Sequence, residues 1–144
     1  MMKFKGLIVL AIAMVCLTPN RVKAEELTVV DEGWLRQIAM AEAEGEGVEG
    51  KAAVMRVVLN RVADERYPGT ISEVIFEPGQ FSTAKIGGRM FTVQADAECV
   101  AAMELVKSGW DKTNGALFFC TSKPCWQTAN RKYLLTLGNH KFYK

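Results

Sequence analysis

Five apolar residues recur along one stretch of the chain, spaced alternately four and three positions apart. They are Val48, Ala52, Met55, Leu59 and Val62. Since an α-helix turns once in about 3.6 residues, this spacing places all five on one side of a helix. The pattern predicts an amphipathic helix over residues 48–65, ended by the sequence RYPG. It is the clearest helix in the sequence and indicates a fold that is largely helical.

A second helical pattern precedes the first. Leu35, Ile38, Ala39 and Glu42 follow the spacing i, i+3, i+4, i+7, which predicts a helix over residues 32–44. The glycines of the sequence EGEGVEG then end it. Glu42 consequently points to the same side as the apolar residues.

Local signals predict the remaining elements. Thr70, with Glu73 three residues later, has the form of a capping box ahead of a short helix over residues 71–76. Apolar spacing predicts another helix over residues 92–107, and the segment TAKIGGRM before it is expected to be a flexible loop. Two short runs, GALFFCTS and KYLLTLG, are predicted to be strands or extended segments. The fold class is therefore mainly α, or α+β, with a small extended C-terminal part.

The N-terminal residues are typical of a secretory signal. A short basic start precedes an apolar run over residues 7–17, which is too short to cross a bilayer. A polar stretch follows and ends in VKA, so cleavage is expected after Ala24. An uncleaved anchor is the alternative. Removal of residues 1–24 leaves one domain, residues 25–144, which we expect to be exported, with no stable membrane insertion.

The charge balance argues against a nucleic-acid partner. The expected signal holds four Lys or Arg residues and no acid, so its removal changes the formal net charge from +2 to −2. The remaining chain has no dense basic cluster of the kind that neutralises phosphates. It also has no internal repeat or linker that would divide the domain. We expect no nucleic-acid partner, and protein partners stay unknown.

Three cysteines remain after the signal. Cys120 and Cys125 flank the sequence TSKP, close enough for a small disulfide loop in an oxidising compartment. Cys99 falls in a helical pattern, where a buried thiol is the more common outcome. A bridge between Cys99 and Cys120 stays open as an alternative.

Several carboxylates crowd the end of the first predicted helix. Glu42 lies on its apolar side, so burial should raise the pKa of this side chain toward the range in which it can donate a proton near neutral pH. Glu44 and Glu49 are expected to be solvated, and the glycines leave the direction of Glu46 open. A partly buried acid without a catalytic role fits the helix phase of Glu42 equally well.

Other chemistries have less support. The chain has one histidine, His140, and neither an HExxH motif nor paired Cys-x-x-Cys motifs, so we expect no metal and no organic cofactor. It has no nucleophile elbow for a catalytic serine. A Cys-His amidase would need a reduced thiolate near His140, which is a minor alternative in an oxidising compartment.

Four sequence blocks cover nearly all of residues 25–144. They are AMAEAEGEGVEGKAAVMRVVLNRV, YPGTISEVIFEPGQFS, GALFF with PCW, and LGNHKFY. In this order they resemble the spore-cortex-lytic (SleB-like) family of cell wall hydrolases. The resemblance implies a lysozyme-like lytic transglycosylase domain that cleaves peptidoglycan glycan strands between N-acetylmuramic acid (MurNAc) and N-acetylglucosamine (GlcNAc). The position that matches the family's catalytic acid is Glu42.

One carboxylate suffices for a lytic transglycosylase. The same group protonates the leaving oxygen and then draws the proton from the muramyl 6-hydroxyl, which closes an anhydro ring. Hydrolysis would require a second carboxylate at a defined separation, for which Glu73, Glu77 and Asp96 are candidates. We therefore expect anhydro-muramyl products. The alternative from another functional class is a catalytically idle module that binds peptidoglycan.

Seven further residues are predicted to bind substrate. They are Gln80, Phe81, Ser82, Phe119, Trp126, Asn139 and His140. The first three lie on the PGQFS turn, the next two are placed to stack on sugar faces, and the resemblance adds the last two. Core packing is the alternative for the aromatic residues, and turn stabilisation is the alternative for the polar ones.

Two departures from the family pattern bear on the substrate groove. The position before Gly45, often basic in relatives, is Glu44 here, and Cys120 and Cys125 interrupt the C-terminal aromatic block. They leave the charge of the groove and the shape of the nearby loop open, while the catalytic acid is unaffected.

Overall fold

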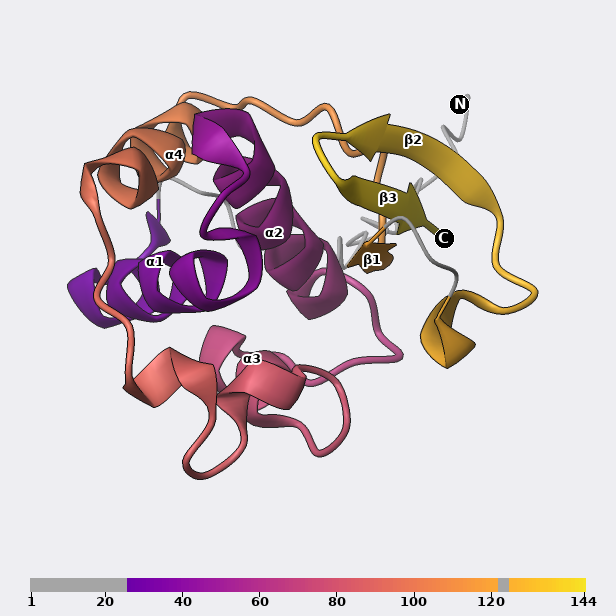
Figure 1. The fold of residues 1–144 in the computed structure, drawn as a ribbon, viewed down its shortest axis with the longest axis horizontal. Coiled ribbons are helices and arrows are strands. Elements are labelled where there is room, and N and C mark those ends of the chain that lie inside the picture. Colours follow the sequence, from indigo (N-terminus) through magenta and orange to yellow (C-terminus); the bar gives the residue numbers. More distant parts are fainter. Residues whose placement is uncertain (1–25, 122–124) are drawn as a thin grey trace, which may run out of the picture.

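The structure, a computed structural model, describes residues 26–121 and 125–144, apart from the side chain of Trp126. The expected signal, residues 1–24, lies outside the described residues. Among the helices of the described part, none is long and apolar enough to cross a membrane. The described chain folds into α-helices, short 3-10 helices and a small sheet, as Figure 1 shows.

The predicted helices are present, although two of them start elsewhere than predicted. They are α1 (Val29–Ala43), α2 (Gly47–Val62), α3 (Ile71–Phe76) and α4 (Ala97–Lys107). α1 starts before residue 32 because the Thr28 hydroxyl accepts a hydrogen bond from the main-chain nitrogen of Asp31 at 3.1 Å. α4 starts after residue 92 because Asp96 accepts one from the main chain of Cys99 at 2.9 Å. Capping residues therefore set where these helices begin.

α2 passes between the other helices and the sheet (Figure 1). Its Val54 and Val58 lie in the main core with residues of α1, α3 and α4. Ala53 and Val57 belong to a second cluster and pack with Phe142 of the sheet. The helix is thus covered on two sides, whereas the sequence pattern predicts one apolar face.

The sheet consists of β1 (Phe118–Thr121), β2 (Tyr133–Leu137) and β3 (His140–Tyr143). Both pairs are antiparallel, and the order is β1-β3-β2. β1 and β2 confirm the two predicted extended segments. β3 is not predicted from the sequence, because four residues give too short an alternation of buried and exposed positions. It is nevertheless the central strand, and its fully buried Phe142 attaches the sheet to α2.

The segment TAKIGGRM does not match the expected loop. It lies within two 3-10 helices, η2 (Ser82–Ala84) and η3 (Arg89–Phe91), and the turn between them. The side chain of Gln37 in α1 donates hydrogen bonds to the main-chain oxygens of Met90 at 2.7 Å and Val93 at 2.5 Å. The prediction of a loop without regular structure is wrong, because the partner that fixes the segment lies 53 positions before Met90.

Candidate active site

Glu42 is half-buried in the last turn of α1. The hydroxyl of Thr83 in η2 donates a hydrogen bond to its Oε1. Burial raises the pKa of Glu42, while the Thr83 hydrogen bonds and the positive charge of Arg61 oppose that rise without cancelling it. The predicted direction of the shift is confirmed. A carboxyl group in this setting keeps its proton to a higher pH than an exposed glutamate does.

The Glu42 side chain lines a cavity of about 400 Å³. Its lining residues are Glu42, Arg61, Gly79, Gln80, Phe81, Ser82, Lys85, Phe119 and Gln127. The fold thus brings together five of the predicted site residues, from α1, the PGQFS turn with η2, and β1. Their part in binding substrate stays a prediction.

Two contacts, one with Phe119 and one with Gln127, hold the turn that carries Gln80 and Ser82 in place. Phe81 is only 5% exposed, and its ring centroid lies 6.2 Å from that of Phe119. Gln127, in η4 (Trp126–Thr128), donates from its side chain to the main-chain oxygen of Gly79 at 3.0 Å. Phe81 therefore forms part of the wall, while Gln80 and Ser82 keep polar groups beside Glu42.

Four residues of this site are not predicted from the sequence. They are Arg61, Thr83, Lys85 and Gln127. Arg61 carries a detectable signal, since it stands three positions after Val58 and seven after Val54 and so shares their helix face. Thr83, by contrast, comes close to Glu42 only through the path of the chain after α3.

Arg61 is 3% exposed and is surrounded by rings. Its guanidinium carbon lies 4.9 Å from the centroid of Phe81 and 5.5 Å from those of Tyr67 and Phe118. Its Nε donates to the main-chain oxygen of Leu117 at 2.8 Å. Burial lowers the pKa of Arg61, and the negative charges nearby, Glu42 among them, oppose that change.

The three candidates for a second carboxylate have different surroundings. Glu73 is exposed at the start of α3 and accepts a hydrogen bond from Thr70 at 2.6 Å. Asp96 caps α4 and lies 3.6 Å from Lys51. Glu77 interacts electrostatically with Arg61, but it does not line the Glu42 cavity. Of the three, Glu77 is thus the one linked to the cavity wall.

Asn139 and His140 lie outside the lining of the cavity. The main-chain nitrogen and Nδ2 of Asn139 donate to the two carboxylate oxygens of Glu46, at 2.7 and 2.9 Å. The His140 ring is 4% exposed and meets the Phe119 ring edge to face at 5.2 Å. Burial lowers the pKa of His140, against the charge of Glu46. His140 thus packs against a residue of the cavity lining, whereas Asn139 binds Glu46, which does not line the cavity. The direction of Glu46, which the sequence leaves open, is toward the β2–β3 turn.

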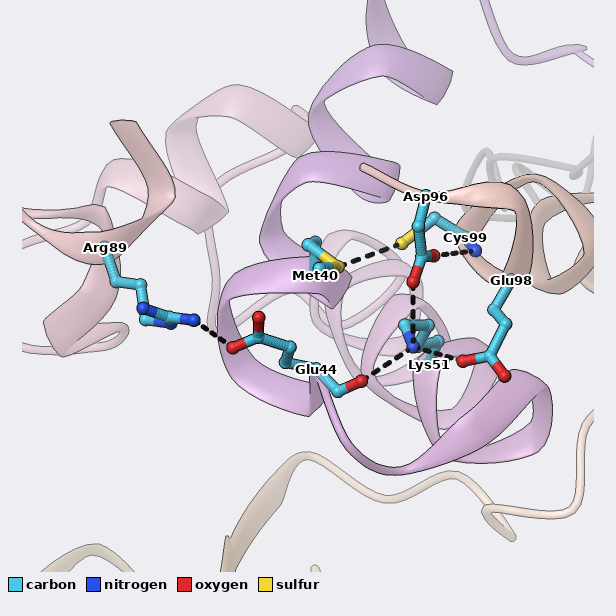
Figure 2. A network of polar contacts seen from close by, with 7 residues as sticks. All are labelled: Met40, Glu44, Lys51, Arg89, Asp96, Glu98 and Cys99. Carbon is cyan, nitrogen blue, oxygen red and sulfur yellow. Dashed lines mark hydrogen bonds and ion pairs between the residues drawn. The ribbon is translucent and has the colours of Figure 1, made fainter. Parts of the chain in front are cut away.

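A buried lysine fixes the end of α1, as Figure 2 shows. Lys51 is fully buried, and its Nζ lies 3.0 Å from the main-chain oxygen of Glu44 and 2.6 Å from Oε2 of Glu98. The Glu44 carboxylate forms an ion pair with Arg89. Glu44 and Glu49 are both exposed, which confirms the prediction for these two.

The three cysteines expected after signal removal all lie within the described residues. Cys99 is a buried thiol in α4, as predicted, and burial raises its pKa to about 11. Cys120 and Cys125 lie 3.5 and 3.6 Å from the hydroxyl of Thr128, which places them close together. Burial acts to raise the pKa of Cys125, but hydrogen bonds with Thr128 and Cys120 lower it overall. No cysteine is among the described residues that line the cavity, and the disulfide between Cys120 and Cys125 stays a prediction.

The family model and the curated relatives that match this chain are all named for enzymes of the cell wall or spore cortex. A family model described as Cell Wall Hydrolase matches residues 45–143, beginning just after Glu42. A spore cortex-lytic enzyme of Bacillus cereus is 36% identical over 108 residues, which are 72% of this chain and 40% of the relative. One of Bacillus subtilis is 32% identical over 113 residues, 75% of this chain and 35% of the relative. The chain thus spans less than half the length of these curated relatives.

Solved structures with this fold are catalytic domains. The catalytic domain of the germination-specific lytic transglycosylase SleB from Bacillus anthracis has a TM-score of 0.72 and 27% identity, over 83% of this chain and 98% of that domain. The catalytic domain of Bacillus cereus SleB has a TM-score of 0.71 and 27% identity, over 88% and 100%. The expected fold, mainly helical with a small sheet, is confirmed. This chain belongs to the cell wall hydrolase family.

Proposed function

We propose that this protein is an exported glycosidase that cleaves peptidoglycan glycan strands at the MurNAc–GlcNAc bond. The observation that carries this proposal is the half-buried Glu42, whose pKa burial raises, in a cavity lined by hydrogen-bonding and aromatic side chains. Cleavage of a glycosidic bond needs a proton donor of this kind at the leaving oxygen. The lytic transglycosylase named among the structural relatives supports the same reaction class.

In the first step, the protonated Glu42 donates its proton to the oxygen that links the two sugars. The bond from that oxygen to the anomeric carbon of the MurNAc residue breaks, and positive charge develops on that carbon. Glu42 is left as a carboxylate, which then accepts the hydrogen bond from Thr83 and faces the charge of Arg61.

In the second step, the Glu42 carboxylate takes the proton of the muramyl 6-hydroxyl. The oxygen of that hydroxyl bonds to the anomeric carbon and closes a 1,6-anhydro ring, so no water enters the product. Glu42 regains its proton and is ready for another cycle. We propose this route over hydrolysis because, of the residues that the structure describes, Glu42 is the one carboxylate that lines its cavity.

The other lining residues suit a sugar polymer. Gln80 and Ser82 offer hydrogen bonds beside Glu42, and Phe119 offers an aromatic surface. Trp126, whose side chain lies outside the described part of the structure, stays a predicted stacking residue. Asn139 and His140 are proposed to hold Glu46 and Phe119 in place rather than to touch the substrate.

The test is product analysis after digestion of purified peptidoglycan sacculi. Glu42→Gln protein, shown to be folded by circular dichroism, should release soluble fragments about 10²- to 10⁴-fold more slowly than the parent. Glu44→Gln, two positions further along and exposed, is the matched control and should keep the parental rate. Mass spectrometry should find anhydro-muramyl ends.

Other products would support other functions. Reducing MurNAc ends would indicate hydrolysis, and released peptides would indicate an amidase. Binding to sacculi without fragments would indicate an idle module. An undiminished rate for Glu42→Gln would show that another residue is the acid.

A further inference from the structure

Arg61 is a buried cation in the wall of the Glu42 cavity. Its exposed fraction is 3%, and burial of a charged group is costly unless the charge has partners. One of its nitrogens, Nε, is bonded to the main-chain oxygen of Leu117. Within the described part of the chain, its buried Nη1 has no hydrogen-bond partner. The side chain is therefore incompletely satisfied by the fold alone.

The position of Arg61 is nevertheless well defined. Its guanidinium lies near three aromatic rings, those of Tyr67, Phe81 and Phe118. Phe81 belongs to the same turn as Gln80 and Ser82, so the guanidinium also packs against the segment that lines the cavity. An apolar residue of similar length would satisfy these ring contacts without the cost of burying a charge.

Two carboxylates from different elements interact with the charge of this cation. Glu42 belongs to α1, and Glu77 follows α3 directly. Both interact electrostatically with Arg61. The Oε2 atom of Glu77 is buried and has no hydrogen-bond partner among the described residues. Among the described residues, Lys85 is the other cation that lines the cavity, and it is exposed.

We propose that Arg61 is a positioning residue that stabilises the Glu42 carboxylate between the two proton transfers, and that Glu77 competes with Glu42 for its charge. The proposal rests on the proposed function, in which Glu42 must be an acid in one step and a base in the next. Burial favours only the protonated form of Glu42. A buried positive charge in the wall of the same cavity offsets part of that preference and makes the charged form attainable after the proton has left.

The two substitutions that test this should act in opposite directions. Arg61→Met removes the charge and keeps most of the length of the side chain, so the midpoint of the Glu42 titration should move upward by about one pH unit. Glu77→Gln removes the competing carboxylate and leaves Arg61 in place, so the same midpoint should move downward. Arg61→Lys keeps a positive charge and should return the midpoint toward the parental value.

The midpoint is measured by NMR on protein labelled with carbon-13 at the glutamate side chains, with Glu42 assigned from the signal that Glu42→Gln lacks. Arg56→Met is the matched control, since Arg56 also lies on α2, where it bonds to the main-chain oxygens of Trp110 and Val106 and lines no part of the Glu42 cavity. It should leave the midpoint unchanged. If Arg61→Met does not fold, Glu77→Gln carries the test alone.

In the activity assay on sacculi, the rate should fall as pH rises through the pKa of Glu42. For Arg61→Met this fall should occur at a higher pH than for the parent, by the same shift as the NMR midpoint. The rate below that pH should drop about tenfold, because the carboxylate that proton donation leaves on Glu42 is less stable without the positive charge, and Arg61→Lys should recover most of it. An unmoved midpoint in both Arg61→Met and Glu77→Gln would overturn the proposal. Because the NMR titration requires no turnover, it gives an answer even if the protein cleaves no peptidoglycan and the proposed function itself fails.

Discussion

Thr83 donates its hydroxyl hydrogen to the carboxylate of Glu42, although the two residues lie 41 positions apart in the sequence. This contact joins the last turn of α1 to η2. A hydroxyl donor favours the charged form of a carboxylate and so lowers its pKa. Thr83 therefore opposes the effect of burial on the pKa of Glu42. Substitution of Thr83 is a direct way to change the protonation of the proposed catalytic acid.

Thr83→Val should move the pH profile of the enzyme upward. Because the first step needs protonated Glu42, the rate falls as pH rises through the pKa of that group. Without the hydroxyl donor the pKa is higher, so the fall comes at higher pH. Initial rates of fragment release from sacculi, measured across the pH range, should reveal the shift. Thr83→Ser keeps a hydroxyl and should retain the parental profile, and identical profiles for Val and Ser would contradict the role assigned to this hydrogen bond.

Glu42→Gln should make the folded protein more stable at neutral pH. The folded-state pKa of Glu42 is raised, so its contribution to stability is present below the unfolded-state pKa and is lost as pH rises through the folded-state pKa. Above that pH the buried charge disfavours the fold. Thermal unfolding at pH 7 should show a melting temperature a few degrees higher for Glu42→Gln than for the parent, and the difference should disappear near pH 4. A constant difference at both pH values would contradict the raised pKa.

Lys51→Met should destabilise the fold substantially. It leaves the main-chain oxygen of Glu44 and the side chain of Glu98 without the ammonium group to which they are bound. Lys51 itself is fully buried, but the Glu98 side chain is 51% exposed, so water can solvate that carboxylate once the ammonium group is gone. The main-chain oxygen left without its donor should account for a loss of about 1–3 kcal/mol in the free energy of unfolding, measured by urea denaturation. Lys112→Met is the matched control. It breaks an ion pair with Glu49 in which both side chains are more than half exposed, so the loss of stability should be much smaller. Equal losses would argue against the role of Lys51.

Gly138→Ala should disturb the contact between the α1–α2 connection and the β2–β3 turn. Gly138 has φ of +56°, and a Cβ atom there would overlap the carboxylate of Glu46, which binds Asn139. We expect a loss of about 1–2 kcal/mol in the free energy of unfolding, together with a changed amide signal for Asn139 in NMR spectra. Gly45→Ala is the control, since nothing lies within 4 Å of a Cβ atom placed there. Similar stability of the two variants would contradict this account.

The sequence predicts well those features that depend on neighbouring residues. Helical spacing placed Glu42 on the apolar side of α1, and four of the other predicted residues share its cavity. Residues whose role depends on distant parts of the chain could not be predicted in this way. Thr83 reaches Glu42 through a segment that Gln37 fixes, and β3 becomes a central strand only because β1 and β2 pair with it on either side.

Arg131→Gln should weaken binding to peptidoglycan at low salt. Arg131 is exposed, its guanidinium carbon lies 4.2 Å from the Phe118 ring centroid, and it lines a smaller cavity that shares Gln80 and Gln127 with that of Glu42. The peptide stems of the proposed substrate carry carboxylates, which this cation attracts. Sedimentation of Glu42→Gln protein with sacculi should show about threefold weaker binding when Arg131→Gln is added, and the difference should shrink as salt screens the charges. Lys132→Gln removes a neighbouring exposed charge that lines neither cavity. An equal effect of that change would mean that the net charge of the protein, and not the position of Arg131, determines the binding.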